Sequence, residues 1–178
     1  MAFREASLET TASPTEVWTV WSDISRWPDW NPDMIASRLD GPLAAGTTGM
    51  IHTRSGGKHD VVVTNFEDGR SFELESGAMP GMRLGIRATV SPSGAGARIS
   101  QAFEARGLLA PLGGAMMGGM ILKTFGEVLA GLKKKVEAGA LARRCQPGVT
   151  RVWLARRHLR SSTLVVISGS TRWAPWST

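Results

Sequence analysis

Hydrophobic and polar positions near the N-terminus repeat with the spacing of an α-helix. Apolar side chains within residues 17–21 fall on one stripe of such a helix. Ser13 is placed to cap its first turn, Pro14 suits the first helical position, and Glu16 completes a capping box. Prolines from Pro28 onward end the helical run. The pattern therefore predicts a short helix, followed by a turn or a second short helix.

Segments before and after this helix alternate between apolar and polar residues, as β-strands do. Residues 2–11 form the first such run. The later runs are residues 34–40, 47–54, 58–66, 71–78, 82–92 and 97–106. Glycine- and proline-containing turns separate them, so the succession predicts an antiparallel meander.

After Gly107 the pattern returns to helical spacing and predicts a long C-terminal helix. Two glycine pairs, at residues 113–114 and 118–119, interrupt this pattern. The stripe expected to face the core comprises Met117, Ile121, Thr124, Phe125, Val128, Leu132 and Val136. Charged residues such as Lys123 and Lys134 lie off this stripe, so one face of the helix is expected to be buried.

This order of elements resembles the SRPBCC superfamily, also called START-like or helix-grip proteins. The likeness is strongest in the tryptophan-rich helix and in the helix ending at residues 129–137, and it is greatest to the polyketide cyclase/dehydrase and lipid-transport branch. The resemblance covers residues 1–139 and implies an α+β helix-grip fold. In that fold a curved antiparallel sheet of about six to seven strands wraps around a long C-terminal helix, with short helices after the first strand. It also implies a hydrophobic cavity between sheet and helix.

The basic charge of the chain belongs to its C-terminal part. The formal net charge is +6, but residues 1–140 hold 14 lysines and arginines against all 15 acids, a net charge of −1. Residues 141–178 hold seven arginines, no lysine and no acid. We therefore divide the chain into a START-like domain at 1–139 and an Arg-rich irregular tail at 140–178, either disordered or derived from a shifted reading frame. The alternative for the tail is a basic arm for acidic lipid headgroups or RNA.

Length and composition predict a single soluble domain. The 178 residues are 42% hydrophobic and 20% charged, as in ordinary globular proteins. The single cysteine, Cys145, has no partner for a disulfide within this chain. The first residues lack the pattern of a signal peptide, and the longest uncharged apolar run, residues 108–122, is shorter than the roughly 20 residues that span a bilayer. We expect a cytoplasmic protein without stable membrane insertion.

Signatures of metal-dependent or nucleophilic hydrolysis are missing from the sequence. It contains no HExxH, CxxC or GxSxG motif. The glycine-rich segments at residues 94–96 and 113–119 lack the further residues of a dinucleotide- or phosphate-binding loop. We therefore expect no metal, no cofactor and no nucleic-acid partner, and we assign no catalytic residue. The oligomeric state is left open.

A hairpin with two histidines, His52 and His59, offers a candidate for acid–base chemistry. If residues 55–57 form its turn, His52 faces Asp60 across the hairpin, and a histidine oriented by a carboxylate can act as a general base. The favoured alternative is a surface pair that contributes a few tenths of a kcal/mol. A change of one residue in the turn would remove the pairing.

Candidate ligand contacts come from the last helix and from polar residues on apolar strand faces. Clustered methionines beside glycines adapt to irregular apolar ligands, with plain core packing as the alternative. Gln101 shares the strand phase of Phe103, and a satisfied core glutamine is the alternative to a ligand contact there. The four N-terminal tryptophans are expected to close one end of the barrel, where Trp30 could rim the pocket. The residues assigned to ligand binding are Trp30, Ser76, Gln101, Phe103, Met116, Met117, Met120 and Ile121.

Three functions of different class fit these observations. The first is binding of a small hydrophobic molecule, lipid- or polyketide-like, in the internal cavity. The second is a polyketide cyclase/aromatase or dehydratase, in which His52 or a buried Arg87 would supply acid–base chemistry. The third is an accessory subunit that docks on a protein or membrane, as the resembled accessory proteins of carbon monoxide dehydrogenase do. We favour the first, because the sequence shows no convergent acid–base set.

Overall fold

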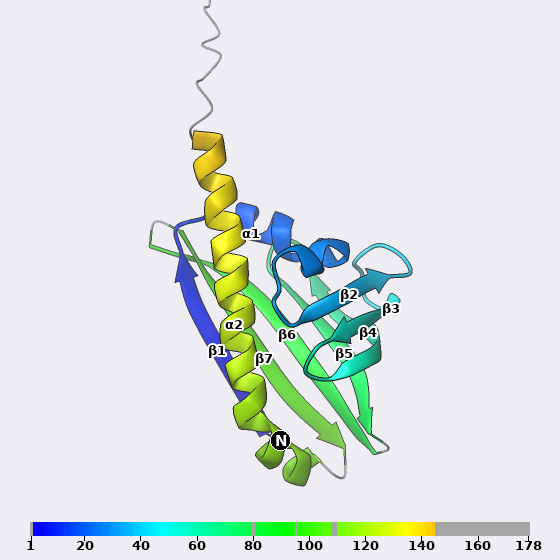
Figure 1. Ribbon diagram of the computed structural model, residues 1–178. Helices are drawn as coiled ribbons and strands as arrows, with labels where there is room; N and C mark the ends of the chain where they lie inside the picture. The colour runs from blue at the N-terminus through cyan, green and yellow to red at the C-terminus, as the bar shows by residue number, and fades with distance from the viewer. Residues whose placement is uncertain (1, 80, 95, 108–109, 145–178) are drawn as a thin grey trace, which may run out of the picture. The chain divides into compact units, whose positions relative to one another are not determined.

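Seven antiparallel strands form one curved sheet, and a long helix lies across its inner face (Figure 1). The computed structural model describes residues 2–79, 81–94, 96–107 and 110–144. The strands are β1 (Ala2–Thr10), β2 (Met34–Leu39), β3 (Thr48–Thr53), β4 (Gly57–Glu67), β5 (Ser71–Met79), β6 (Met82–Ser93) and β7 (Gly96–Gly107). The helices are α1 (Pro14–Trp21), the 3-10 helix η1 (Ile24–Asp29) and α2 (Ala110–Arg144).

The strand order in the sheet is β1-β7-β6-β5-β4-β3-β2. Strands β2 to β7 form a meander, and β1 pairs with β7 at its edge. Every predicted strand coincides with an observed one to within one residue at each end. The helix-grip fold predicted from the sequence is therefore confirmed. Two details differ, since α2 is continuous through both glycine pairs and extends beyond residue 139 to Arg144. The rest of the predicted tail, residues 145–178 with Cys145, lies outside the described residues.

Helix α1 begins with the capping box that its sequence predicts. The Ser13 hydroxyl accepts a hydrogen bond from the Glu16 backbone amide at 3.3 Å, and the Glu16 carboxylate accepts one from the Ser13 amide at 2.9 Å. Both amides would otherwise be unpaired at the helix start. At the other end of the helix the Trp18 indole N–H donates to Asp68 at 3.0 Å, which ties α1 to the β4–β5 turn.

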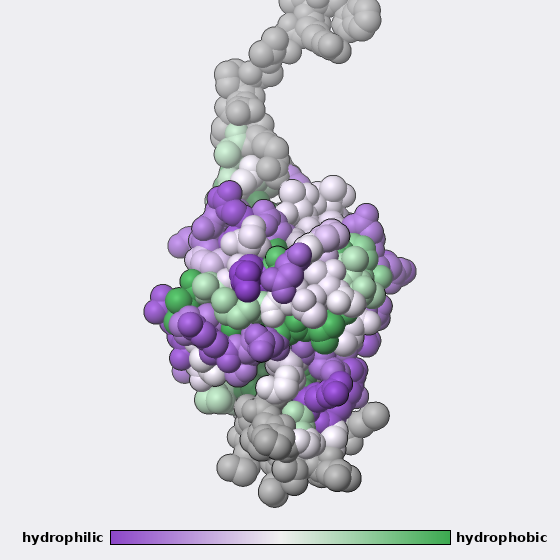
Figure 2. Space-filling model, turned by 90° about the vertical axis from the view of Figure 1, so that its right-hand side faces the viewer, coloured by the Kyte–Doolittle hydropathy of each residue, from purple (hydrophilic) through white to green (hydrophobic). Residues whose placement is uncertain are grey.

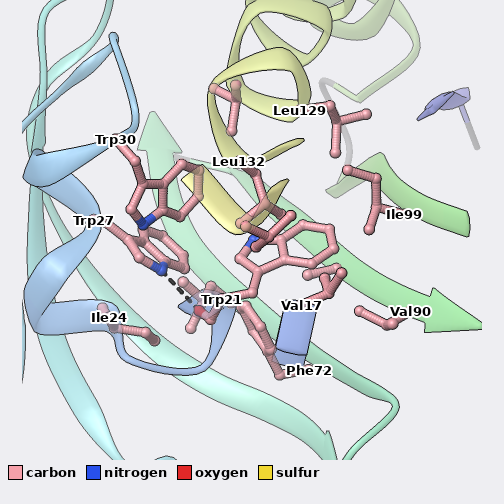
Figure 3. Packing of buried hydrophobic residues seen from close by; sticks show 14 of the residues in the cluster. Val17, Trp21, Ile24, Trp27, Trp30, Phe72, Val90, Ile99, Leu129 and Leu132 are labelled. Atoms are coloured by element: carbon pink, nitrogen blue, oxygen red, sulfur yellow. Dashed lines mark hydrogen bonds between the residues drawn. The ribbon is translucent and has the colours of Figure 1, made fainter. Parts of the chain in front are cut away.

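The core centres on tryptophans from α1 and η1 (Figure 3). The rings of Trp21 and Trp27 pack on Phe72, with centroids 6.1 and 6.0 Å from its ring. The Trp27 indole N–H donates to the Trp21 carbonyl at 2.8 Å, so this buried polar group has a partner. From the other side, Leu129 and Leu132 of α2 are completely buried against the same cluster. The two short helices, α2 and the sheet thus share one core.

Helix α2 approaches the end of η1 very closely at Gly131. A Cβ atom at this position would collide with the backbone carbonyl oxygen of Trp30 and would lie 3.3 Å from the Pro32 ring. Only glycine fits there, although glycine is a poor helix former. The contact therefore fixes how near the C-terminal half of α2 lies to the segment that joins η1 to β2.

We predict that Gly131→Ala destabilises the protein, because the added methyl group forces α2 away from the Trp30 carbonyl. Overpacking of this kind costs about 1–3 kcal/mol. Gly126→Ala is the matched control, since a Cβ there meets nothing within 4 Å and should stabilise the helix by roughly 0.5–1 kcal/mol. Urea unfolding of both variants at neutral pH measures the difference. Equal free energies of unfolding for Gly131→Ala and Gly126→Ala would contradict the tight contact at Gly131.

Candidate functional site

A cavity of about 300 Å³ lies between the inner face of the sheet and the N-terminal half of α2. Its walls come mainly from β3, β6, β7 and α2. Leu84 and Ile86 pack against the buried cluster of Phe103 and Phe125, yet they are only half-buried and border this space. The apolar lining residues are Ile51, Leu84, Ile86, Phe103, Met120, Ile121 and Phe125.

A smaller, deeper hollow of about 80 Å³ lies next to the cavity, toward the tryptophans. Six residues line both spaces: Asp33, Ile51, Thr53, Ile86, Thr124 and Phe125. The deep hollow is further bordered by Gln101 and Ala88, and by the core rings of Trp21, Trp27 and Phe72. Because they share so much wall, the two spaces adjoin between the sheet and α2.

Polar side chains gather at one side of the cavity, where the β3–β4 hairpin meets the loop before β2. They are Asp33, Thr53, Ser55 and His59. The Asp33 carboxylate accepts hydrogen bonds from the Ser55 backbone amide at 2.9 Å and from its hydroxyl at 2.8 Å. The Arg54 amide donates to the Asp33 carbonyl at 2.7 Å. These bonds hold the hairpin turn against the loop and engage both carboxylate oxygens of Asp33.

The hairpin turn differs by one residue from the predicted one. Residues 54–56 form the turn and Thr53 pairs with Gly57, so His52 faces Lys58. Gly57 has a φ of +81°, a conformation that favours glycine at the end of a tight turn. The expected His52–Asp60 pair is therefore wrong. Its physical cause is the set of bonds from Asp33, which position the turn one residue earlier.

His59 is the histidine that faces the cavity. It pairs with Ile51 across the hairpin and shares the inner face of β4 with Val61 and Val63, both buried. The alternation of residues 59, 61 and 63 is the signal that could have identified it from the sequence. Within the described part of the chain, the His59 imidazole makes no hydrogen bond.

The structure brings together four of the predicted ligand contacts around the cavity: Ser76, Phe103, Met120 and Ile121. Gln101 lines the deep hollow. Trp30 is buried beside Trp27, with ring centroids 6.3 Å apart, and borders neither space. The side chains of Met116 and Met117 lie outside the described residues.

Arg87 lies on the outer face of the sheet, because it alternates along β6 with the inward-facing Ile86 and Ala88. Its side chain is 50% exposed and donates two hydrogen bonds to Glu73, at 2.8 and 3.1 Å. The expectation of a buried Arg87 that serves as an acid or base is therefore wrong.

Glu73 is the buried centre of an ion-pair network on this outer face. Its carboxylate pairs with Arg87 at 2.8 Å and with Arg106 at 2.9 Å. Burial alone would raise the pKa of Glu73, but the hydrogen bonds and charges of the two arginines outweigh it and hold the pKa below its ordinary value. The neighbouring Gly85 leaves room for this arrangement, since a Cβ there would lie 3.1 Å from a Glu73 oxygen. The network belongs to the stability of the sheet and not to the cavity.

We predict a pH-dependent contribution of Glu73 to stability. Because its folded-state pKa lies below the ordinary value of 4.5, the contribution is present above that pH and is lost as the pH falls through the folded-state pKa. Glu73→Gln should therefore cost about 1–3 kcal/mol at pH 7 and progressively less under acid conditions. The exposed pair of Glu67 with Arg70 supplies the control, as Glu67→Gln should cost less than about 0.5 kcal/mol. Urea unfolding from pH 7 down to pH 3 tests both; a constant cost of Glu73→Gln across that range would refute the prediction.

Apolar side chains outside the cavity are scattered over the described surface. The large exposed ones are Ile35 and Leu141, while Met120, also exposed, lines the cavity. On the face shown in Figure 2, which lies to the right in Figure 1, polar side chains break up the apolar surface, and no broad apolar patch forms. Among residues 2–79, 81–94, 96–107 and 110–144, no helix is long and apolar enough to cross a membrane. The same ranges contain no group of three metal-ligating side chains.

The curved sheet, the helix that it grips and the cavity between them define a helix-grip protein. More specifically, the chain belongs to the family described as polyketide cyclase / dehydrase and lipid transport, whose sequence model matches residues 4–137. A search of curated protein sequences gave no match.

Solved structures with the same fold are distant in sequence. XoxI from Bacillus cereus has 16% identity and a TM-score of 0.63 over 79% of this chain and 99% of its own. DynU16, from the dynemicin biosynthetic locus, has 15% identity and a TM-score of 0.62 over 78% of this chain; the match spans only 48% of DynU16. Norcoclaurine synthase from Thalictrum flavum, solved with dopamine and hydroxybenzaldehyde, has 17% identity and a TM-score of 0.61 over 76% of this chain and 86% of its own. At these identities the likeness shows the fold alone.

Proposed function

We propose that the protein binds a small hydrophobic molecule, lipid- or polyketide-like, in the cavity between the sheet and α2. The observation that carries the proposal is the apolar space of about 300 Å³ with polar groups at one side. Sites for small molecules are concave, mostly apolar and supplied with a few polar groups that orient the ligand. The half-buried Leu84 and Ile86 support the proposal, because a bound apolar molecule would cover them.

Membership of a family named for polyketide cyclases and lipid transport supports the same ligand class. The norcoclaurine synthase structure with dopamine and hydroxybenzaldehyde supports the view that this fold can accommodate small aromatic molecules. A lipid-like or an aromatic ligand would make apolar contacts with the half-buried side chains that line the cavity.

Filling the cavity tests the proposal. Leu84→Trp should weaken binding of 1-anilinonaphthalene-8-sulfonate about tenfold or more, because an indole would occupy the space that the probe needs. Thr89→Trp is the matched control, since Thr89 lies on the same strand but faces the outer side. Fluorescence titration gives the affinities, and circular dichroism checks that both variants fold. Equal weakening by both substitutions would place the site outside the cavity.

A polyketide cyclase or dehydratase is the second candidate function. His59 favours it, because an imidazole on the cavity wall can accept and donate protons. Two observations favour binding without catalysis. Both carboxylate oxygens of Asp33 are engaged by Ser55, and no described residue orients His59 through a hydrogen bond. A general base works best when a third group fixes it in this way.

We predict that His59→Ala keeps the affinity for the probe within about threefold of the native value, since apolar walls supply most of the contact. We also expect a polyketone incubated with the native protein to be recovered unchanged by mass spectrometry. His52→Ala serves as a control on the outer face of the hairpin. If the native protein converts the polyketone and only His59→Ala loses this activity, the protein is an enzyme. The proposal of ligand binding without catalysis would then be overturned.

A further inference from the structure

Gln101 has a buried polar atom without a partner at the wall of the deep hollow. Its side-chain oxygen is enclosed and accepts no hydrogen bond in the described structure. Buried amides in folded proteins are normally paired, because an unpaired one loses its hydrogen bonds to water and gains nothing in return. This glutamine therefore calls for a physical explanation.

The neighbours of Gln101 on the inner face of the sheet are all apolar. Ala6 and Ala88 pair with it from the two flanking strands, and Ile99 and Phe103 precede and follow it on β7. The alanines are too small to cover the amide, so the space above it belongs to the hollow. No neighbouring strand offers a hydrogen-bonding side chain to Gln101.

Three other polar side chains around the deep hollow have partners. The Asn31 side-chain oxygen accepts from the Asp33 amide at 3.0 Å, and the Thr53 hydroxyl accepts from the Gly56 amide at 3.0 Å. The Thr124 hydroxyl donates to the Met120 carbonyl at 3.2 Å. Those three groups are therefore explained by the fold itself, whereas Gln101 is not.

We infer that Gln101 selects ligands that carry a hydroxyl at the end buried in the deep hollow. The inference rests on the proposed function and specifies its ligand class as an alcohol or phenol with an apolar body. A glutamine amide both donates and accepts hydrogen bonds, and a hydroxyl can meet both needs. A methyl group can meet neither, and a carboxylate would bring a charge into an apolar space. The hollow of about 80 Å³ admits the hydroxyl-bearing end, and the body of the ligand occupies the larger cavity.

Two probes of similar shape test this selection, 2-naphthol and 2-methylnaphthalene, which differ by a hydroxyl in place of a methyl group. Their affinities for the full-length protein are measured at pH 7 by isothermal titration calorimetry. Gln101→Leu should weaken 2-naphthol about tenfold and leave 2-methylnaphthalene unchanged or tighter. Thr124→Val is the matched control: it removes a hydroxyl from the same hollow, but one already bound to Met120, so the ratio of the two affinities should change less than about twofold.

The outcomes separate this inference from the proposed function. If the native protein binds both probes and Gln101→Leu leaves their affinity ratio unchanged, the inference is overturned and the cavity proposal stands. If the native protein binds neither probe saturably, the proposed function fails as well.

Thermal unfolding without any probe gives a further, independent result. Gln101→Leu should melt at the same temperature as the native protein or higher, because it removes an unpaired buried polar atom. A large drop in melting temperature would show that the amide serves the fold, and would overturn the inference even if the variant were too unstable to titrate.

Discussion

The contact between Gly131 and the Trp30 carbonyl determines where the long helix lies on the sheet. Beyond it, Leu132 and Val136 are buried in the tryptophan-containing core. Glu137 then accepts hydrogen bonds from the Thr10 hydroxyl at 3.0 Å and the Thr11 amide at 3.1 Å, at the end of β1. The C-terminal half of α2 is thus fixed by close packing and by polar bonds.

The cavity lies beside the N-terminal half of the same helix. Around residues 120–125 of α2, Phe125 is buried with Phe103 of the sheet, while Leu84 and Ile86 pack against this pair, border the cavity and stay half-buried. A side chain at position 131 would push the helix outward and change the packing at the tryptophan end.

Buried polar groups are treated differently on the two faces of the sheet. On the outer face, Glu73 is buried but matched by two arginines, so its charge is neutralised and its hydrogen bonds are made. On the inner face, the Gln101 oxygen has no such partner. The Trp30 indole N–H is also buried without a partner, but Trp30 lies in the core, whereas the Gln101 oxygen lies at the wall of the deep hollow. An unpaired polar atom at such a wall costs stability, as polar groups at binding sites do.

Most of the fold could be predicted from local patterns. The strands alternate cleanly and end at turn residues, and the capping box of Ser13 with Glu16 marks the start of α1. Strand phase also placed Ser76 and Phe103 on the inner face, where they line the cavity. The same alternation predicts that Arg87 faces outward, so its position could also have been predicted from the sequence.

What the sequence could not reveal depends on contacts between distant residues. The partner of His52 across the hairpin depends on Asp33, whose carboxylate holds the turn at Ser55. Trp30 lies in the core and not at the rim of the cavity, and its carbonyl meets Gly131, far along the chain. The local preference of a residue for helix, strand or turn carries no information about such contacts between distant parts of the chain.

The position of His59 decides the chemical argument about the site. With His59 on the inner face, the cavity has an imidazole at its polar side and an unpaired amide oxygen, that of Gln101, in the adjoining hollow. Apolar walls attract a ligand without directing it, because the hydrophobic effect has no preferred orientation. Two separated polar groups would supply that direction, since a molecule that bonds to both can lie only one way round.

Catalysis would require, in addition, that the imidazole be held in one orientation. Asp33, the carboxylate on the same side of the cavity, cannot do this because it is already engaged by the turn. The arrangement thus favours a protein that orients its ligand over one that transforms it.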